Sequence, residues 1–198
     1  MIVRKALNLK NIFMLVVGLG NPGPDSENNR HNIGFKIIDA INSHFKLSKQ
    51  KPKFKGLLTT GNINEKKVYA IKPLTFMNNS GICIRELIEY FKIEAGNIIV
   101  FHDDLDIDFG KIKTKFGGSS AGHNGIESID KFIGKDYSRV RIGIGKPNDK
   151  ITVSDYVLKD FDDDEKQQLE TLKNNITENL AILIDKKLDL FSSTVNNK

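Results

Sequence analysis

Histidine, carboxylate and amide side chains recur in four short segments of this sequence. Asn21 and His31 lie in "GLGNPGPDSENNRHNIGF", Asn78 in "KPLTFMNNSG", Asp103 in "VFHDDLD" and Asn124 in "GGSSAGHNG". Near neutral pH a histidine can take a proton from water, and a carboxylate can hold the histidine ring in one tautomer. Side-chain amides can orient that water and donate hydrogen bonds to a developing oxyanion. The five residues therefore predict a hydrolytic site in which a histidine base activates water.

Each of these residues also has an ordinary structural explanation. His31 could be a surface residue at the start of a helix, and Asn78 could cap the helix that begins near Ser80. Asp103 could be one of several solvated acids, and Asn124 could be a turn residue beside a glycine. Loops at the carboxyl ends of strands, however, meet in one crevice of an α/β sheet. We therefore expect the predicted site residues to share one cleft.

The sequence gives no sign of a covalent nucleophile or a catalytic metal. No serine or cysteine occupies a nucleophile elbow, and the four histidines are too sparse to suggest a catalytic metal site. Cys83, the single cysteine, permits no intramolecular disulfide and argues against a structural zinc site. We expect Cys83 to be buried in a helix and the protein to need no cofactor.

A G-x-G-x-x-G pattern follows the first apolar run and ends at Gly23. In a dinucleotide-binding loop, this pattern leads directly into a helix whose N-terminus faces the pyrophosphate. Pro22 and Pro24 disfavour helical geometry in the residues that precede them, and the next helix is predicted only near His31. The glycines are therefore predicted to allow a sharp turn and a close approach of the backbone to a substrate.

Basic residues alternate with apolar residues in two predicted strands. Lys113 and Lys115 lie in "GKIKTKF", and Arg139 and Arg141 lie in "RVRIGIG". Lys113, Lys115 and Arg141 together could hold a phosphate group, since all three would carry a positive charge. A solvated face of the sheet explains the same pattern equally well.

Strand-like and helix-like segments alternate along the chain, which predicts an α/β fold. Strands are expected over residues 12–17, 56–63, 66–72, 97–103, 110–116 and 139–145, with a basic loop over 46–55. Helices are expected over residues 31–45, over 80–97 with Gly96 as its stop signal, and from Asp162, which has capping-box spacing with Glu165. One domain is predicted over residues 12–190, between an N-terminal extension (1–11) and a C-terminal tail (191–198).

The composition indicates a soluble globular protein. The 198 residues are 39% hydrophobic and 28% charged, with a net charge of +5, a balance that favours a polyanionic partner. The first apolar stretch resembles a signal peptide, but it is short and leads into a polar segment rather than a cleavage site. No stretch approaches the ~20 apolar residues that cross a membrane. We therefore expect a cytoplasmic protein with no membrane contact.

Five blocks of the sequence resemble those of bacterial-type peptidyl-tRNA hydrolases. They lie in the family's order between residues 16 and 147: "GLGNPG…RHNIGF", "KPLTFMNNSG", "HDDLD", "GGSSAGHNG" and "RVRIGIGKP". The resemblance implies a single α/β domain, usually monomeric, with a mixed twisted sheet sandwiched between helices. It also implies hydrolysis of the ester between a peptide and the 3′-terminal ribose of tRNA, without a metal.

The resemblance assigns a role to each of the five polar residues by its position in a motif. His31 resembles the catalytic base, and Asp103 resembles its partner. Asn21 and Asn78 resemble residues that hold the peptide and the 3′ CCA end of the tRNA. Asn124 resembles the residue that orients the water and the substrate carbonyl.

The same resemblance extends to residues that would bind the rest of peptidyl-tRNA. Lys113, Lys115 and Arg141 resemble a clamp on the 5′-phosphate of the acceptor arm, and Phe76 resembles an aromatic wall of the channel. Ser26 stands where the family usually has tyrosine. This departure puts aromatic stacking by that loop in doubt but leaves the histidine chemistry intact.

Two other functions fit parts of the sequence. A non-catalytic RNA-binding protein could use the same fold, as plastid splicing-factor relatives do, but the full set of catalytic residue types favours an enzyme. A nucleotide-dependent oxidoreductase would need the glycine-rich loop to bind a dinucleotide. Hydrolysis of peptidyl-tRNA is therefore the predicted function.

Overall fold

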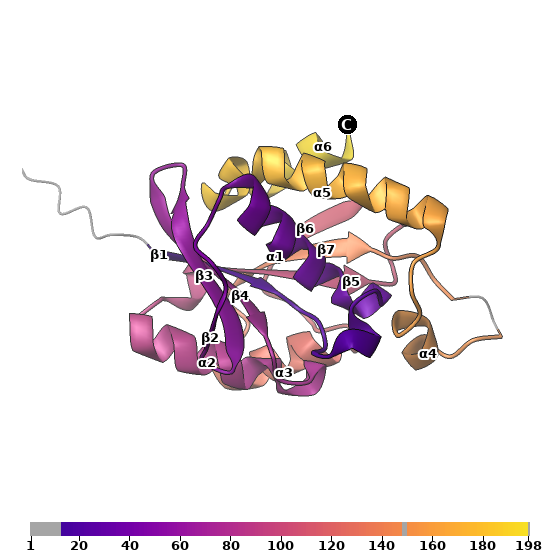
Figure 1. Cartoon of the computed structure of the whole chain (residues 1–198), viewed down its shortest axis with the longest axis horizontal. Coiled ribbons are helices and arrows are strands. Elements are labelled where there is room, and N and C mark those ends of the chain that lie inside the picture. Colours follow the sequence, from indigo (N-terminus) through magenta and orange to yellow (C-terminus); the bar gives the residue numbers. More distant parts are fainter. Residues whose placement is uncertain (1–12, 148–149, 198) are drawn as a thin grey trace, which may run out of the picture.

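A mixed sheet of seven strands runs through the part of the chain that the computed structural model describes, residues 13–147 and 150–197 (Figure 1). The strands are β1 (Phe13–Gly18), β2 (Lys51–Lys53), β3 (Gly56–Ile63), β4 (Lys66–Pro73), β5 (Ile98–Asp104), β6 (Ile112–Phe116) and β7 (Ser138–Gly143). Their spatial order is β2-β3-β4-β1-β5-β7-β6. The four central strands are parallel, whereas β2, β3 and β6 pair antiparallel with their neighbours. The predicted α/β class is confirmed.

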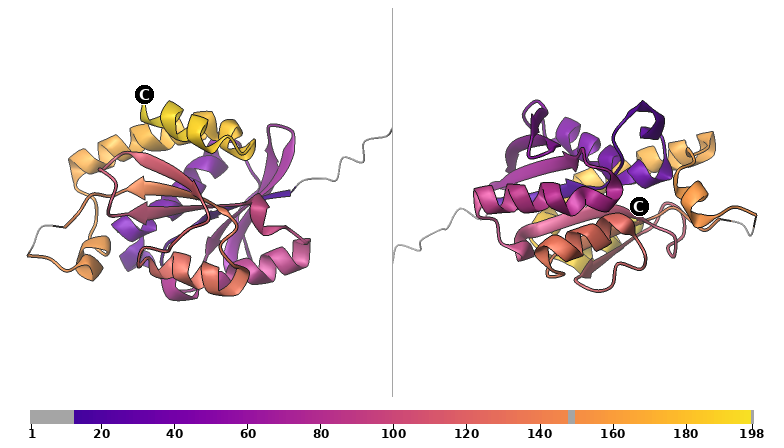
Figure 2. Two further views of the ribbon diagram at one scale, coloured as in Figure 1. Left: turned by 180° about the vertical axis from the view of Figure 1, so that it is seen from behind. Right: turned by 90° about the horizontal axis from the view of Figure 1, so that it is seen from below.

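Helices cover both faces of this sheet (Figures 1 and 2). On one face lie α1 (Ile33–His44), α5 (Asp163–Ile184) and α6 (Leu188–Asn196), and on the other lie α2 (Ser80–Phe91) and α3 (Asn124–Ile133). The short α4 is Val153–Val157, and single 3-10 turns are η1 (Pro24–Ser26), η2 (Arg30–Asn32), η3 (Met77–Asn79) and η4 (Ala95–Asn97). No described helix is both long and apolar enough to cross a bilayer.

The strands bury alternate residues against the two helical layers. Val16 and Phe101 point into the core beneath α1, α5 and α6, whereas Val17 and Val100 point into the core above α2 and α3. Because the central strands bury apolar side chains on both faces of the sheet, their sequences are continuous hydrophobic runs. The capping box at the start of α5 is present as predicted.

The first turn of α1 lies directly against the carboxyl ends of β1 and β5. A Cβ atom on Gly34 would lie 2.3 Å from the backbone nitrogen of Leu19, and one on Gly18 would lie 2.1 Å from the carbonyl oxygen of Gly34. Gly18 therefore makes room for the backbone of α1, rather than for a substrate as the sequence suggested. Gly23, at φ +104°, forms the predicted sharp turn.

Several boundaries differ from the sequence predictions. Part of the predicted basic loop pairs with β3 as the edge strand β2. The helix α2 ends at Phe91 because Lys92 adopts a left-handed conformation, and Gly96 lies beyond it in η4. The predicted C-terminal tail is also wrong, since it falls largely within α6, where Phe191 is fully buried. The predicted extension, residues 1–11, lies outside the described residues.

Candidate active site

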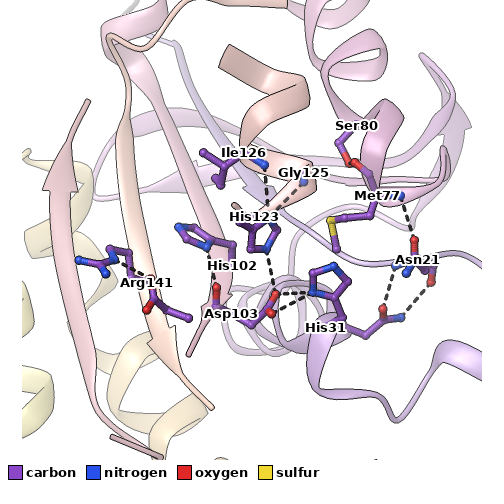
Figure 3. Close-up of polar contacts among 12 residues, drawn as sticks. Asn21, His31, Met77, Ser80, His102, Asp103, His123, Gly125, Ile126 and Arg141 are labelled. Atoms are coloured by element: carbon purple, nitrogen blue, oxygen red, sulfur yellow. Dashed lines mark hydrogen bonds and ion pairs between the residues drawn. The ribbon is translucent and has the colours of Figure 1, made fainter. Parts of the chain in front are cut away.

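The centre of the candidate site is a buried pair formed by His31 and Asp103 (Figure 3). His31 lies in η2, immediately before α1, and Asp103 lies at the carboxyl end of β5. The Nδ1 atom of His31 lies 2.8 Å from Oδ1 and 2.9 Å from Oδ2 of Asp103. A carboxylate only accepts hydrogen bonds, so Nδ1 carries the hydrogen atom and donates a hydrogen bond to Asp103. Nε2 of His31 therefore keeps its lone pair and can act as a base.

His123 contacts the same carboxylate oxygen as His31, and the centroids of the two rings lie 4.9 Å apart. Its Nε2 lies 3.0 Å from Oδ1 of Asp103, while its Nδ1 accepts hydrogen bonds from the backbone N–H groups of Gly125 and Ile126. Because Nδ1 is an acceptor, the neutral ring carries its hydrogen atom on Nε2, which donates a hydrogen bond to Asp103. His123 thus caps the N-terminus of α3 and orients the carboxylate that holds His31 (Figure 3).

These hydrogen bonds also keep Asp103 ionised. Burial by itself would raise the pKa of Asp103, but His123 and His31 more than offset this and hold it well below its usual range. A permanently ionised carboxylate stabilises the positive charge that His31 would gain by accepting a proton.

His102 lies beside this group and is buried. Its Nδ1 donates to the backbone carbonyl oxygen of Asp103 at 2.8 Å, and its ring meets that of His123 edge-on with centroids 4.8 Å apart. Its Nε2 has no hydrogen-bond partner among the described residues. Burial, and then repulsion from His123, lower the pKa of His102 to about 3, so His102 is neutral at physiological pH.

Asn21 joins the β1 loop to the loop that follows β4. Its Oδ1 accepts the backbone N–H of Met77 at 2.9 Å, and its own backbone is held by the side-chain amide of Asn32 through bonds of 2.8 and 2.9 Å. Because Oδ1 faces an N–H donor, the Nδ2 group of Asn21 remains available to donate. A hollow of about 270 Å³ is lined by Asn21, Asn32 and Leu74, but not by His31 or Asp103.

The other predicted substrate residues lie in the surrounding loops, and none of them makes a hydrogen bond or ion pair with His31 or Asp103. Asn78 follows the buried Met77 and is exposed, and its side chain does not cap α2. Phe76 is 67% exposed. Asn124, next to His123, is exposed at the start of α3. Ser26 is half-buried in η1, and its side chain makes no hydrogen bond within the described part of the chain.

The predicted phosphate clamp lies on the edge strand β6 and on its neighbour β7. Lys113 is the cross-strand partner of Arg141, and Lys115 is the partner of Arg139. Arg139 is buried and bonded to Asp130 at 2.7 Å, so it is not part of a solvated face.

The three proposed clamp residues are not equally available. Nε of Arg141 lies 2.7 Å from Oδ2 of Asp104, which partly neutralises it (Figure 3). The ammonium groups of Lys113 and Lys115 have no carboxylate partner among the described residues. The lysines are therefore the more available cations.

A metal ion is an alternative occupant of the histidine group. One ligand atom from each of His31, Asp103 and His123 lies within 4.8 Å of the other two. The His31 and His123 nitrogens that face Asp103 both carry hydrogen atoms, so a cation would have to displace two protons. The arrangement fits a hydrogen-bonded group better than a metal-ligand set.

Three residues in or beside the candidate site were given no role by the sequence analysis. His123 and His102 adjoin the predicted Asn124 and Asp103, so their neighbours in the motifs were the available signal. Arg30, next to His31, is buried against the rings of Tyr156 and Phe161, and nothing in the local sequence signalled this contact.

Comparison with known proteins places the chain in a family. Residues 15–198 match the family model described as peptidyl-tRNA hydrolase. The peptidyl-tRNA hydrolase of Pelagibacter ubique is 80% identical over 94% of this chain and all of its own, and that of Ehrlichia canis is 45% identical over 94% and 95%. The crystal structure of Acinetobacter baumannii peptidyl-tRNA hydrolase matches with a TM-score of 0.86, at 33% identity over 94% and 95% of the two chains. The chain therefore belongs to the peptidyl-tRNA hydrolase family.

Proposed function

We propose that this protein hydrolyses the ester between the peptide and the 3′-terminal ribose of peptidyl-tRNA, with His31 as the general base. Family membership supports the overall reaction. The observation that carries the role of His31 is its bond to the buried, ionised Asp103, because this bond leaves Nε2 unprotonated.

The reaction begins with attack of water on the ester carbonyl. Nε2 of His31 takes one proton of the water as the water oxygen bonds to the carbonyl carbon, and the carbonyl oxygen becomes an oxyanion. When this intermediate collapses, the bond to the ribose oxygen breaks and His31 returns the proton to that oxygen. The products are a free peptide carboxyl group and tRNA with an intact 3′ hydroxyl.

The side-chain amides position the reacting atoms. Nδ2 of Asn21, whose Oδ1 is fixed by Met77, holds the peptide and the 3′ end by donating to the substrate. Asn124, beside His123, orients the water and donates to the oxyanion. Asn78 holds the 3′ end of the tRNA, and Phe76 forms the wall of the channel.

The remaining contacts are with the tRNA and need no further cofactor. Lys113, Lys115 and Arg141 hold the 5′-phosphate of the acceptor arm, with the two lysines supplying most of the uncompensated charge. Ser26 lines the channel without aromatic stacking. The enzyme works as a cytoplasmic monomer and requires no metal, because His31 activates the water directly.

The decisive experiment measures release of labelled N-acyl-amino acid from tRNA. His31→Ala should lower kcat by about 10²- to 10⁴-fold, whereas His44→Ala, on the exposed side of α1, should retain the wild-type rate. Equal rates for wild type and His31→Ala would show that His31 is not the base. Absence of turnover by the wild-type protein, with tRNA still bound, would instead support a non-catalytic RNA-binding function.

A further inference from the structure

The edge of the sheet opposite the phosphate clamp carries a second group of cations. Lys46, Lys49, Lys51, Lys53 and Lys55 are all exposed and lie within ten residues that contain no acid. Lys55 pairs with Glu86, but the other four have no carboxylate partner in the described part of the chain. We call residues 46–55 the β2 edge. Its charge is largely uncompensated, so it would attract a polyanion.

Aromatic rings adjoin the β2 edge. Tyr69 and Phe91 stack with centroids 4.2 Å apart, Phe91 meets Phe54 at 5.6 Å, and Phe54 meets Tyr90 at 5.2 Å. The Nζ atom of Lys53 lies 4.7 Å from the ring centroid of Tyr90. Tyr69 is buried, whereas Tyr90 is 63% exposed at the outer end of the series. A ring supported from behind in this way offers a fixed surface on which a base can stack.

The β2 edge connects to the candidate active site. The backbone N–H of Leu74 donates to the carbonyl oxygen of Lys55 at 2.8 Å, and Leu74 begins the loop that carries Phe76 and Asn78. The phosphate clamp lies on β6 and β7, at the other end of the seven-strand order. With strands about 4.8 Å apart, six intervals separate β2 from β6 by roughly 29 Å, too far for both to hold one phosphate.

We propose that the β2 edge is a second RNA-binding surface. It binds a single-stranded segment of RNA at a place separate from the clamp proposed for the acceptor stem. Lys51 and Lys53 project from alternate positions of an extended strand, about 7 Å apart, and contact successive phosphates. Tyr90 stacks one base. Lysine and proline on an edge strand can also serve to prevent unwanted strand pairing. Prevention of strand pairing, however, does not require an exposed tyrosine that packs on other aromatic rings beside the lysines.

The test measures binding of a fluorescent oligouridylate of about 12 nucleotides, by anisotropy over a range of salt concentrations. Lys51→Gln/Lys53→Gln should weaken binding and reduce the slope of log K against log[salt] by about 1.4, since each lost single-strand phosphate contact removes about 0.7. Tyr90→Ala should weaken binding about 5- to 100-fold with the slope unchanged, and Tyr90→Phe should restore it. A duplex of the same length should bind more weakly than the single strand.

The matched control is Lys166→Gln/Lys187→Gln, which removes the same charge from the α5 and α6 side of the molecule. It should leave the salt slope near that of the wild type. Both double variants should hydrolyse peptidyl-tRNA at the wild-type kcat, which separates this proposal from the proposed catalytic function. The proposal fails if the oligouridylate does not bind, if the two double variants have the same slope, if Tyr90→Ala binds like the wild type, or if the duplex binds as tightly as the single strand.

Discussion

Nε2 of His123 lies 3.0 Å from Oδ1 of Asp103, the same oxygen that lies 2.8 Å from Nδ1 of His31. Asp103 therefore accepts hydrogen bonds from two imidazole rings. The two rings differ in whether the second ring nitrogen has a hydrogen-bond partner. The second nitrogen of His123 is occupied by the backbone of α3, whereas the second nitrogen of His31 has no bond to another described residue. Of the two rings bonded to Asp103, only that of His31 therefore has a nitrogen free to act as the proposed base.

Replacement of Asp103 by asparagine should reverse the tautomer of His31. In Asp103→Asn the side-chain amide donates to Nδ1, which forces the proton onto Nε2 and removes the base. We expect kcat to fall by about 10⁴-fold, as in other histidine–carboxylate pairs, with little change in fold. Hydrolysis of labelled N-acyl-aminoacyl-tRNA gives the rate, and ¹⁵N chemical shifts of the imidazole give the tautomer. Wild-type turnover in a variant with the reversed tautomer would rule out Nε2 as the base.

The two roles of His123 can be separated by His123→Asn. An asparagine oxygen can still cap α3, but the shorter side chain cannot reach Asp103. Because the lost bond was to a charged group, kcat should fall about 10- to 100-fold, with the melting temperature nearly unchanged. His123→Ala should lose the cap as well and reduce the free energy of unfolding by about 1 kcal/mol. Full activity in His123→Asn would mean that Asp103 needs no second donor.

Removal of metal ions should leave the reaction unchanged. The nitrogens of His31 and His123 that face Asp103 carry hydrogen atoms in the hydrogen-bonded arrangement, so an ion bound by this set would have to displace two protons. After dialysis against a chelator, kcat and KM should equal those of untreated enzyme. A loss of activity that returns on adding a divalent cation would instead assign the three residues to a metal site.

The sequence predicted the site better than its surroundings. The sequence motifs single out His31 and Asp103, and loops at the carboxyl ends of parallel strands generally meet in one crevice. The structure brings the two residues into contact, as expected. The tautomer of His123 depends on the first turn of α3, which no local pattern of residue types reveals. The pairing of Arg141 with Asp104 likewise depends on the register of β5 and β7.

Errors in the predicted elements have a common physical cause. The end of α2 was assigned to Gly96, but Lys92 adopts the left-handed conformation that usually favours glycine. The predicted tail, residues 191–198, contains Phe191, which is fully buried in the core between the sheet and α1, α5 and α6. In both cases tertiary packing outweighs local propensity, which is a weak guide near the ends of helices.

Stability should depend on the protonation of His102. Its folded pKa is about 3, below the usual value of 6.5, so between these values the unfolded chain binds a proton that the folded protein does not. The free energy of unfolding should therefore fall as pH decreases from about 6.5, by about 1.4 kcal/mol per pH unit from this residue.

The lowered pKa of Asp103 adds a separate loss only below about pH 4, where the unfolded carboxyl gains its proton. Urea unfolding of wild type and His102→Asn between about pH 7 and pH 4 isolates the histidine contribution. The variant should lose most of this pH dependence, and His44→Asn should retain it. Parallel pH profiles for wild type and His102→Asn would contradict the assignment.

Arg30 should anchor α4 and the start of α5 to the loop that carries His31. Its Nη2 lies 2.6 Å from Oε2 of Glu165, and the guanidinium lies over the ring of Tyr156 at 4.6 Å. In Arg30→Met the largely buried Glu165 loses its partner, so the free energy of unfolding should decrease by about 3 kcal/mol and the melting temperature by about 6–12 °C. Arg30→Met/Glu165→Gln should recover part of this loss, because no unpaired charge remains. A double variant no more stable than Arg30→Met would show that the loss comes from ring packing rather than from the ion pair.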